Sequence, residues 1–183
     1  LDLVGDKTEL DKRMIDEIGD PLNHLVRNCI DHGIEPVDVR LRHGKPEVAT
    51  VRLSAAHRGN SVFITVEDDG GGIDTTRVGQ IAVDRGLLTA DTVATLAERD
   101  LIELIWQPGF STARAVSDIS GRGVGMDIVR TKIAALNGSI EVESTRGAGT
   151  RFTIRLPLTL TITRCMLFRL PQGVVAVPIE NIR

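Results

Sequence analysis

Apolar residues near the start of the chain recur with the spacing of one helix face. Between residues 10 and 32 they follow the pattern i, i+3, i+4, i+7 and i+8, at Leu22, Leu25, Val26, Cys29 and Ile30. This periodicity predicts an amphipathic α-helix. Pro21 stands where a helix can begin, and Gly33 stands where one can end. We therefore expect a helix that buries one face and stops at the glycine.

Two runs of alternating apolar and polar residues follow and predict a pair of strands. Residues 48–56 and 61–67 alternate in this way, and the sequence HRGN between them is typical of a hairpin turn. The second run leads directly into the sequence DDGGG at residues 68–72. The expected hairpin therefore ends in a polar turn that is rich in glycine.

The middle of the chain returns to helical spacing in short pieces. Residues 75–105 predict two or three helices, with a turn at Arg85 and Gly86 and a helix start near Thr89. Residues 107–123 are polar and contain glycine, which indicates a mobile loop.

The last third predicts one more helix and then strands. A helix is expected over 124–137, and strands are expected at 139–143 and 150–156. Beyond Pro157, residues 158–183 are rich in strand-forming residues around a Pro-Gln-Gly turn. Together these elements predict an α+β fold, in which a mixed, mostly antiparallel sheet carries helices on one face as a two-layer α/β sandwich.

The composition is that of an ordinary globular protein. The 183 residues are 42% hydrophobic and carry a formal net charge of −3. Without a basic stripe and with few aromatic residues, the chain lacks the surface that nucleic-acid binding needs, so no nucleic-acid partner is expected. No apolar run approaches the roughly 18 to 20 residues of a membrane span. The 18 glycines are about a tenth of the chain, more than the roughly 7% that is usual.

The cysteines and the chain ends favour a cytoplasmic fragment. Cys29 and Cys165 lie far apart without a CxxC pair, which favours neither a disulfide framework nor a zinc site and fits a reducing cytoplasm. The sequence starts without Met and stops within an apolar pattern. We therefore expect a piece of a longer polypeptide.

The first candidate site is a set of polar residues on the opening helix. Steps of four residues rotate an α-helix by about 40° beyond a full turn, so His24, Asn28 and His32 drift slowly along one face, with Asp31 beside them. A carboxamide oxygen suits Mg²⁺, and an imidazole can donate to a phosphate oxygen. The alternative is a solvated back face of the helix.

The second candidate site is the DDGGG turn. A carboxylate at a strand end, here Asp68, can accept a hydrogen bond from an exocyclic amine such as that of adenine. Glycines such as Gly70 and Gly72 let the backbone approach a flat ring closely. An ordinary tight turn is the alternative, although it explains only one glycine easily.

The third candidate site is the sequence GRGVG at residues 121–125, immediately before a helix. Backbone N–H groups at a helix N-terminus can bind an anion, and glycines free them to wrap a phosphate. Arg122 adds positive charge. The spacing matches neither GxGxxG after a strand nor GxxxxGK[ST], so the dinucleotide and P-loop motifs are both excluded. A flexible linker is the alternative.

In this order the motifs resemble the GHKL superfamily of ATP-binding proteins. The segments similar to its N, G1, F and G2 boxes are residues 24–33, 68–72, 106–112 and 121–125. Within that superfamily, the stretches HLVRNCIDHGIE, EDDGGGID, QPGFSTA, SDISGRGVGMDIVR and GSIEVESTRGAGTRFTIRLPLTL resemble the catalytic domain of the CheA family of chemotaxis histidine kinases. The resemblance covers nearly the whole chain.

The resemblance implies a GHKL catalytic domain at residues 1–157 and, at 158–183, the first strands of a truncated CheW-like regulatory domain with unpaired edges. The implied activity is transfer of the γ-phosphoryl of ATP to a histidine on a separate phosphoacceptor domain, with Mg²⁺ held by Asn28. His24, Asn28 and His32 are the implied catalytic residues. The residues implied in nucleotide binding are Asn28, Asp31, His32, Asp68, Gly70, Gly72, Ser111, Thr112, Gly121, Arg122, Gly123, Val124, Gly125, Met126 and Thr150.

One position separates the activities within the superfamily. Members of the superfamily that hydrolyse ATP, such as Hsp90, gyrase B and MutL, resemble one another in having a Glu four residues before the N-box Asn. This chain has His24 at that position. A carboxylate base helps a water nucleophile, whereas a neutral imidazole acceptor needs no such base. His24 therefore favours a kinase over the two alternatives, a GHKL ATPase and a nucleotide-binding module without activity.

The resemblance also implies partners that lie outside this chain. They are a CheW-like adaptor and chemoreceptors, bound through the following domain near the membrane, and a second subunit, because the parent kinase is expected to be a homodimer. None of the four histidines lies in a stretch similar to a phosphoacceptor helix. We therefore expect the chain alone to bind nucleotide without phosphorylating itself.

Overall fold

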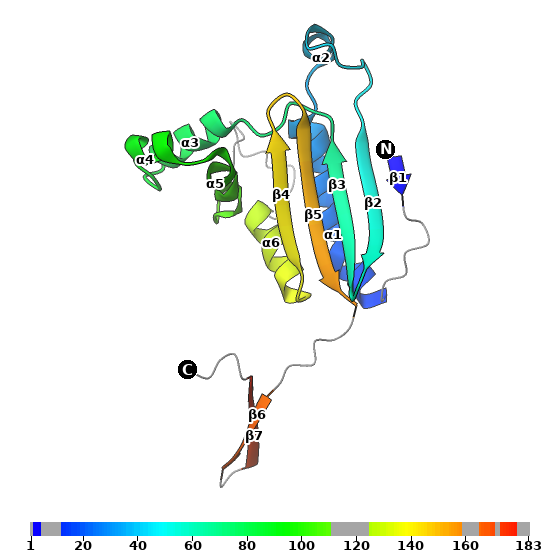
Figure 1. Cartoon of the computed structure of the whole chain (residues 1–183), viewed down its shortest axis with the longest axis vertical. Coiled ribbons are helices and arrows are strands. Elements are labelled where there is room, and N and C mark those ends of the chain that lie inside the picture. Colours follow the sequence, from blue (N-terminus) through cyan, green and yellow to red (C-terminus); the bar gives the residue numbers. More distant parts are fainter. Residues whose placement is uncertain (1, 5–11, 111–124, 159–164, 171–172, 179–183) are drawn as a thin grey trace.

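The protein is described by a computed structural model covering residues 2–4, 12–110, 125–158, 165–170 and 173–178. Its centre is a five-stranded sheet in the order β1-β2-β3-β5-β4 (Figure 1). β1 pairs with β2 in parallel, and the other neighbours are antiparallel. The strands are β1 (Asp2–Val4), β2 (Val51–Arg58), β3 (Ser61–Asp68), β4 (Ser139–Thr145) and β5 (Gly149–Pro157). The predicted mixed, mostly antiparallel sheet is confirmed.

The β2–β3 hairpin forms as predicted, with a tighter turn. Arg58 pairs with Ser61, so only Gly59 and Asn60 connect the strands. Gly59 has φ +59°, a left-handed conformation that glycine adopts at little cost. The expected four-residue turn is therefore shorter by two residues, which extend β2.

The alternation along β3 carries one polar residue into the interior. Val62, Ile64 and Val66 are buried at every second position, and Asp68 continues the same series at the end of the strand. Successive side chains of a strand point to opposite faces of the sheet. Asp68 is therefore buried because it shares the core face of β3.

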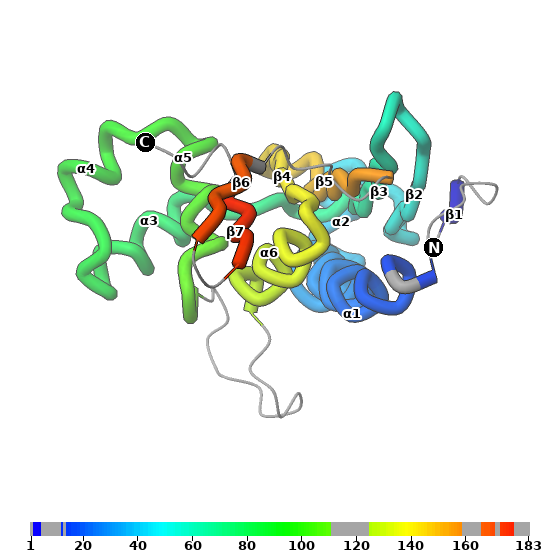
Figure 2. The backbone as a smooth tube through the Cα atoms, turned by 90° about the horizontal axis from the view of Figure 1, so that it is seen from below, coloured from blue at the N-terminus to red at the C-terminus, as the bar shows by residue number. Residues whose placement is uncertain are grey.

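Helices cover the core face of the sheet. α1 (Lys12–Asn28), continued by the π-helical turn η1 (Cys29–Gly33), lies beside α6 (Met126–Ala135) across this face (Figure 2). The helices α3 (Thr75–Asp84), α4 (Ala90–Thr95) and α5 (Glu98–Ile102) and the 3₁₀-helix η2 (Glu103–Trp106) extend from the side of β4 (Figure 1). The three short helices agree with the prediction for 75–105. The helix α2 (Val37–Arg42) was not predicted.

Two details of the first helix differ from the prediction. Pro21 is a buried residue inside α1 and does not start the helix. Because proline has no N–H, the helix loses one i to i−4 hydrogen bond there. The helix tolerates this loss because the proline ring is packed in the interior. Ile30 was expected in the core, yet it is 57% exposed. It lies in η1, where Ile34 N–H bonds Cys29 O five residues back, so the 3.6-residue periodicity no longer applies.

The core lies between the sheet and α1, η1, η2 and α6. Its largest buried side chains come from all of these elements and include Leu25, Ile133, Ile154, Leu156 and Trp106. Trp106 packs edge-on against Phe152, with 6.4 Å between the ring centroids. A second cluster around Val78, Ala82, Leu101 and Phe110 joins α3 to α5. Burying an aliphatic side chain of this size contributes about 1.5–3 kcal/mol.

The outer strands of the five-stranded sheet are β1 and β4. β1 has three residues, and β4 exposes the carboxylates of Glu141 and Glu143. The strands β6 (Cys165–Leu170) and β7 (Gly173–Pro178) form a separate antiparallel pair with exposed apolar side chains, among them Leu167 and Phe168. No helix in the described part of the chain is long and apolar enough to span a membrane.

Candidate functional site

The candidate site is organised around Asp68, where the end of β3 meets the end of the first helix. Asp68 is 8% exposed. Its Oδ1 accepts hydrogen bonds from the N–H of Gly70 (2.9 Å) and the N–H of Thr150 (3.3 Å). The end of the first helix lies against the same carboxylate, because a Cβ on Gly33 would be 3.0 Å from Asp68 Oδ2 and the Cys29 thiol is close enough to affect the pKa of Asp68. Three segments distant in the sequence therefore hold one carboxylate in place.

Burial shifts the ionisation of this pair. Burial raises the pKa of Asp68 above its ordinary value, because the hydrogen bonds from Gly70, Cys29 and Thr150 offset only part of the desolvation. Burial, followed by the nearby Asp68 carboxylate, raises the pKa of the Cys29 thiol far above its ordinary value. Cys29 therefore stays a protonated donor at neutral pH.

Two of the three glycines in the DDGGG turn, Gly70 and Gly72, are required by contacts within this chain. A Cβ on Gly70 would overlap the carbonyl oxygen of Gly33, and one on Gly72, which has φ +72°, would overlap that of Thr145. Gly71 N–H bonds the same Gly33 oxygen at 2.8 Å. The turn is therefore packed between the end of the first helix and the β4–β5 turn. Close approach of a flat ring to these glycines stays a prediction.

The polar residues of the first helix separate into two pairs. His24 and Asn28 are half-buried on α1, whereas Asp31 and His32 are exposed on η1. The π-helical turn between Asn28 and His32 changes the regular four-residue rotation that was expected. π-Helical turns of this kind are frequent at functional sites.

Asn28 connects the first helix to the segment that follows residue 124. Its Nδ2 donates to Met126 Sδ at 3.1 Å. A thioether accepts but cannot donate, so the amide nitrogen faces Met126 and the carbonyl oxygen faces the other way. The implied residues Asn28 and Met126 are thus brought together.

His24 is held in its neutral form at pH 7. Burial lowers its pKa, and the positive charges of Arg27 and His32 lower it further. His24 and His32 are therefore close enough to influence each other. A negatively charged ligand near the two histidines would raise the pKa of His24.

Several implied residues lie outside the described residues. They are Ser111, Thr112, Gly121, Arg122, Gly123 and Val124. Gly125 is described as the residue before α6, where a Cβ would overlap Asp127 Oδ1. Thr150 is buried, and its hydroxyl is 3.1 Å from that of Ser144, which also accepts from Ile73 N–H at 2.8 Å. No sequence motif marked Ser144 as a site residue.

An ionic cluster that was not predicted lies beside the DDGGG turn. Arg40, which is 1% exposed, and Lys45 bind Glu35 and the backbone or side chain of Asp69. Arg40 lies on α2 and Lys45 lies in the loop that follows it, where no motif marked these two cations. Bonds to Lys45 and Arg40 outweigh the opposing effect of burial and lower the pKa of Glu35.

The donor set fits a magnesium ion that is bound mainly by a nucleotide. Within the described ranges, no group of three or more His, Cys, Asp and Glu residues forms a metal cluster. Mg²⁺ usually keeps several waters and takes one or two protein oxygens besides substrate phosphates. The outward carbonyl oxygen of Asn28 can supply one such ligand.

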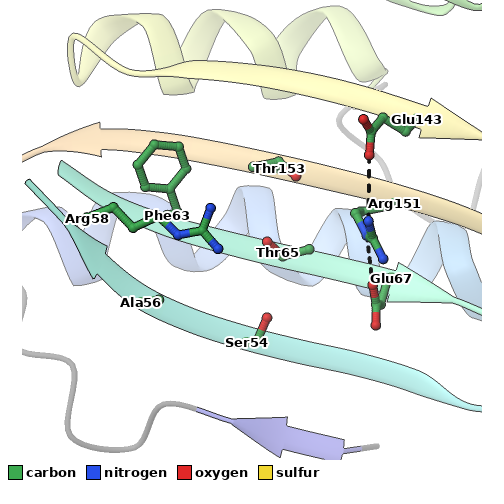
Figure 3. A pocket seen from close by; sticks show the side chains of 9 residues that line it. All are labelled: Ser54, Ala56, Arg58, Phe63, Thr65, Glu67, Glu143, Arg151 and Thr153. Carbon is green, nitrogen blue, oxygen red and sulfur yellow. Dashed lines mark hydrogen bonds and ion pairs between the residues drawn. The ribbon is translucent and has the colours of Figure 1, made fainter.

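A pocket of about 300 Å³ lies on the opposite, open face of the sheet (Figure 3). Phe63, Thr65 and Glu67 of β3 point into it, and Arg151 lies between Glu67 and Glu143 with ion-pair distances of 2.8 and 3.7 Å. None of the implied site residues lines this pocket. The candidate site is therefore on the helix side of the sheet.

A mixed, mostly antiparallel sheet with helices on one face and a buried Asp in a glycine turn agree with the ATP-binding domain that the motifs imply. The chain belongs to the family of histidine kinase-, DNA gyrase B- and HSP90-like ATPases, whose model matches residues 17–160. The predicted superfamily and fold are thereby confirmed.

Curated relatives narrow the likeness to one group of that family. The chain is 51% identical over 182 residues to chemotaxis protein CheA of Bacillus subtilis, which covers 100% of this chain and 27% of the relative. It is 43% identical over 180 residues to sensor histidine kinase CheAY of Helicobacter pylori, covering 98% of this chain and 22% of that protein. The chain thus spans about a quarter of the length of these relatives.

A solved structure supports the fold alone. The catalytic domain of histidine kinase ThkA aligns with a TM-score of 0.51 at 19% identity, covering 86% of this chain and 78% of that one.

Proposed function

We propose that this chain is the ATP-binding catalytic domain of a CheA-type histidine kinase and that it passes the γ-phosphoryl of ATP to a histidine on a separate phosphoacceptor domain. The observation that carries the proposal is the convergence of the N-box helix end and the glycine turn on the buried carboxylate of Asp68. The family and the CheA relatives support the same activity.

Asp68 is proposed to recognise the adenine base. Two backbone N–H groups bind Oδ1, and Oδ2 is the oxygen that would accept from the exocyclic amine. Only the ionised carboxylate offers acceptors without a competing proton. Gly70 and Gly72 would lie along the ring, and Thr150 would support the same carboxylate.

Asn28 is proposed to ligate Mg²⁺ through its carbonyl oxygen, with His24, Asp31 and His32 near the phosphates. The metal supplies charge neutralisation for the triphosphate. The chain's own contribution is positioning: Met126 fixes the orientation of Asn28, and His24 can donate a ring N–H to a phosphate oxygen. His24 also stands where the members that hydrolyse ATP have a Glu. His24 therefore supports phosphoryl transfer over hydrolysis.

The remaining assignments rest on the resemblance. Gly121, Arg122, Gly123, Val124 and Gly125 would wrap the triphosphate, as N–H groups at a helix start do. The residues proposed at one end of the loop that closes over the nucleotide are Ser111 and Thr112.

We also propose the division into a catalytic domain at 1–157 and a CheW-like segment at 158–183. The separate β6–β7 pair and the family match ending at 160 support it. A cytoplasmic parent kinase that dimerises and binds an adaptor and chemoreceptors belongs to the same proposal.

The test measures binding first and transfer second. Calorimetry with Mg-ATP is compared for the wild type, Asn28→Ala and Asn23→Ala, a control on the exposed side of the same helix. Only Asn28→Ala should lose Mg²⁺-dependent affinity. Adding a phosphoacceptor domain should then yield phosphohistidine. Phosphate release without transfer would favour an ATPase, and absence of wild-type binding would contradict the proposal.

A further inference from the structure

The ionic cluster beside the DDGGG turn consists of Glu35, Arg40, Lys45 and Asp69, and we name these four residues the turn clamp. Two cations face two carboxylates, so the side-chain charges balance. Arg40 Nη1 is 3.1 Å from Glu35 Oε2, and Arg40 Nη2 is 3.0 Å from Asp69 Oδ2. Lys45 Nζ is 2.7 Å from Glu35 Oε1.

The turn clamp also holds the backbone of the turn. Lys45 Nζ donates to the carbonyl oxygens of Asp69 (2.9 Å) and Gly70 (2.6 Å). Arg40 Nη1 donates to the same Asp69 oxygen at 3.2 Å. All three protons of the Lys45 ammonium group are therefore used, two of them on consecutive peptide groups.

Peptide geometry transmits these contacts to Asp68. A peptide group is planar and trans, so its C=O and N–H point in opposite directions. Fixing the Asp69 carbonyl therefore aims the Gly70 N–H, which donates to Asp68 Oδ1 at 2.9 Å. Fixing the Gly70 carbonyl aims the Gly71 N–H, which donates to Gly33 O at 2.8 Å. The clamp thus sets the direction of a donor to the Asp68 carboxylate.

Three of the four side chains of the turn clamp are shielded from water, and that of Asp69 is 37% exposed. Arg40 is 1% exposed, and the side chains of Glu35 and Lys45 are 12% and 15% exposed. Removing one partner from a buried charge cluster leaves the others without compensation. Asp69 is further held by Thr50 N–H, 3.0 Å from its Oδ1.

We propose that Lys45 and Arg40 are positioning residues for base recognition, which hold the Asp69 and Gly70 carbonyls so that Asp68 presents Oδ2 to the exocyclic amine. The inference rests on the proposed role of Asp68. Neither residue touches the nucleotide; each acts through the peptide groups of the turn.

The test compares ADP with IDP, which carries a carbonyl oxygen in place of the adenine amine. A site built to accept from an amine rejects an analogue that lacks the donor. Lys45→Met should weaken ADP binding by about tenfold, as expected when one hydrogen bond to a charged group is misaligned, and leave IDP binding unchanged. Arg42→Met is the matched control, since Arg42 forms an exposed pair with Asp38.

Two further measurements separate positioning from general stability. Hydrogen exchange of the Gly70 and Gly71 amides in the nucleotide-free chain should accelerate in Lys45→Met relative to Arg42→Met. Lys45→Arg, which keeps the charge and several donors, should restore part of the ADP preference. If Lys45→Met does not fold, Glu35→Gln is measured in its place, and its ADP preference should also fall.

The outcomes distinguish this inference from the proposed function. Wild-type preference for ADP that persists in a folded Lys45→Met or Glu35→Gln variant overturns the clamp and leaves the proposed function standing. Equal losses of ADP and IDP affinity also overturn it. A wild type that binds ADP and IDP equally overturns the proposed role of Asp68, and the positioning role with it.

Discussion

Replacing Gly70 by Ala tests how tightly the glycine turn packs against the first helix. The added Cβ would overlap the carbonyl oxygen of Gly33 and lie 2.8 Å from Asp68 Oδ1. The φ angle at Gly70 is outside the left-handed region, so the cost comes from contact and not from backbone strain. Because Gly33 O is backbone and already accepts from Gly71 N–H, no side-chain rotation relieves the overlap.

The magnitude follows from two effects. Inserting a methyl group into a packed site costs about 1–3 kcal/mol, and losing the Gly71–Gly33 hydrogen bond costs about 0.5–1.5 kcal/mol. We therefore expect Gly70→Ala to lower the free energy of unfolding by about 2–4 kcal/mol, measured by urea denaturation. Nucleotide affinity should fall as well, because the same displacement moves the Gly70 N–H away from Asp68.

A second glycine provides the control. Gly19 lies in α1 with no heavy atom within 4 Å of an added Cβ, so Gly19→Ala should raise the free energy of unfolding by about 0.5–1 kcal/mol through helix propensity. A Gly70→Ala variant as stable as the wild type would refute the close packing of the turn.

Three further predictions concern ionisable groups. Because the pKa of Asp68 is raised in the folded chain, its contribution to stability is fully present below the ordinary carboxyl pKa of about 4. That contribution is lost as pH rises through the raised pKa. In urea denaturation, the Asp68→Asn variant should lack this pH-dependent decrease in the free energy of unfolding. Because burial and neighbouring charges lower the pKa of His24, nucleotide binding near pH 6.5 should take up protons, as calorimetry in buffers of different ionisation enthalpy would detect. Cys29 is 2% exposed and its thiol has a raised pKa. In a Cys165→Ser variant, Cys29 should therefore react with a thiol reagent more than about tenfold slower when the chain is folded than when it is unfolded.

Each of these predictions has a contradicting result. Parallel pH profiles of stability for the wild type and Asp68→Asn would show that the carboxyl titrates normally. Proton uptake that persists in His24→Asn would assign it to another group. Rapid modification of Cys29 in the folded chain would mean that the thiol is accessible and does not bind Asp68.

The elements that carry the nucleotide motifs could be predicted from the sequence, because local periodicity determines them. The alternation through Val62, Ile64 and Val66 identifies the buried face of β3, and counting two further residues assigns Asp68 to that face. Thr89 and Asp74 accept hydrogen bonds from N–H groups three residues later, as residues of these types do at helix starts. Such signals need only a few neighbouring positions.

The turn clamp could not be predicted, because its contacts join distant positions. Arg40 meets Asp69 across 29 positions of sequence, and no local pattern distinguishes it from the exposed Arg42 two residues later. The π-helical turn also left no signal, since the apolar spacing through Cys29 fits an α-helix equally well. Only the assembled backbone brings Gly33 against Gly70 and changes the phase of the helix.

The two edges of the central sheet affect how other proteins meet this domain. A strand added along β4 by a second copy would bring Glu141 and Glu143 of the two copies together, and β1 spans three residues in the described part of the chain. Extending the sheet is therefore an unfavourable way to bind. Under the proposed function, a phosphoacceptor domain would bind, receive its phosphoryl group and dissociate. Sheet edges that resist strand addition would make that binding depend on side-chain contacts, which are easily reversed.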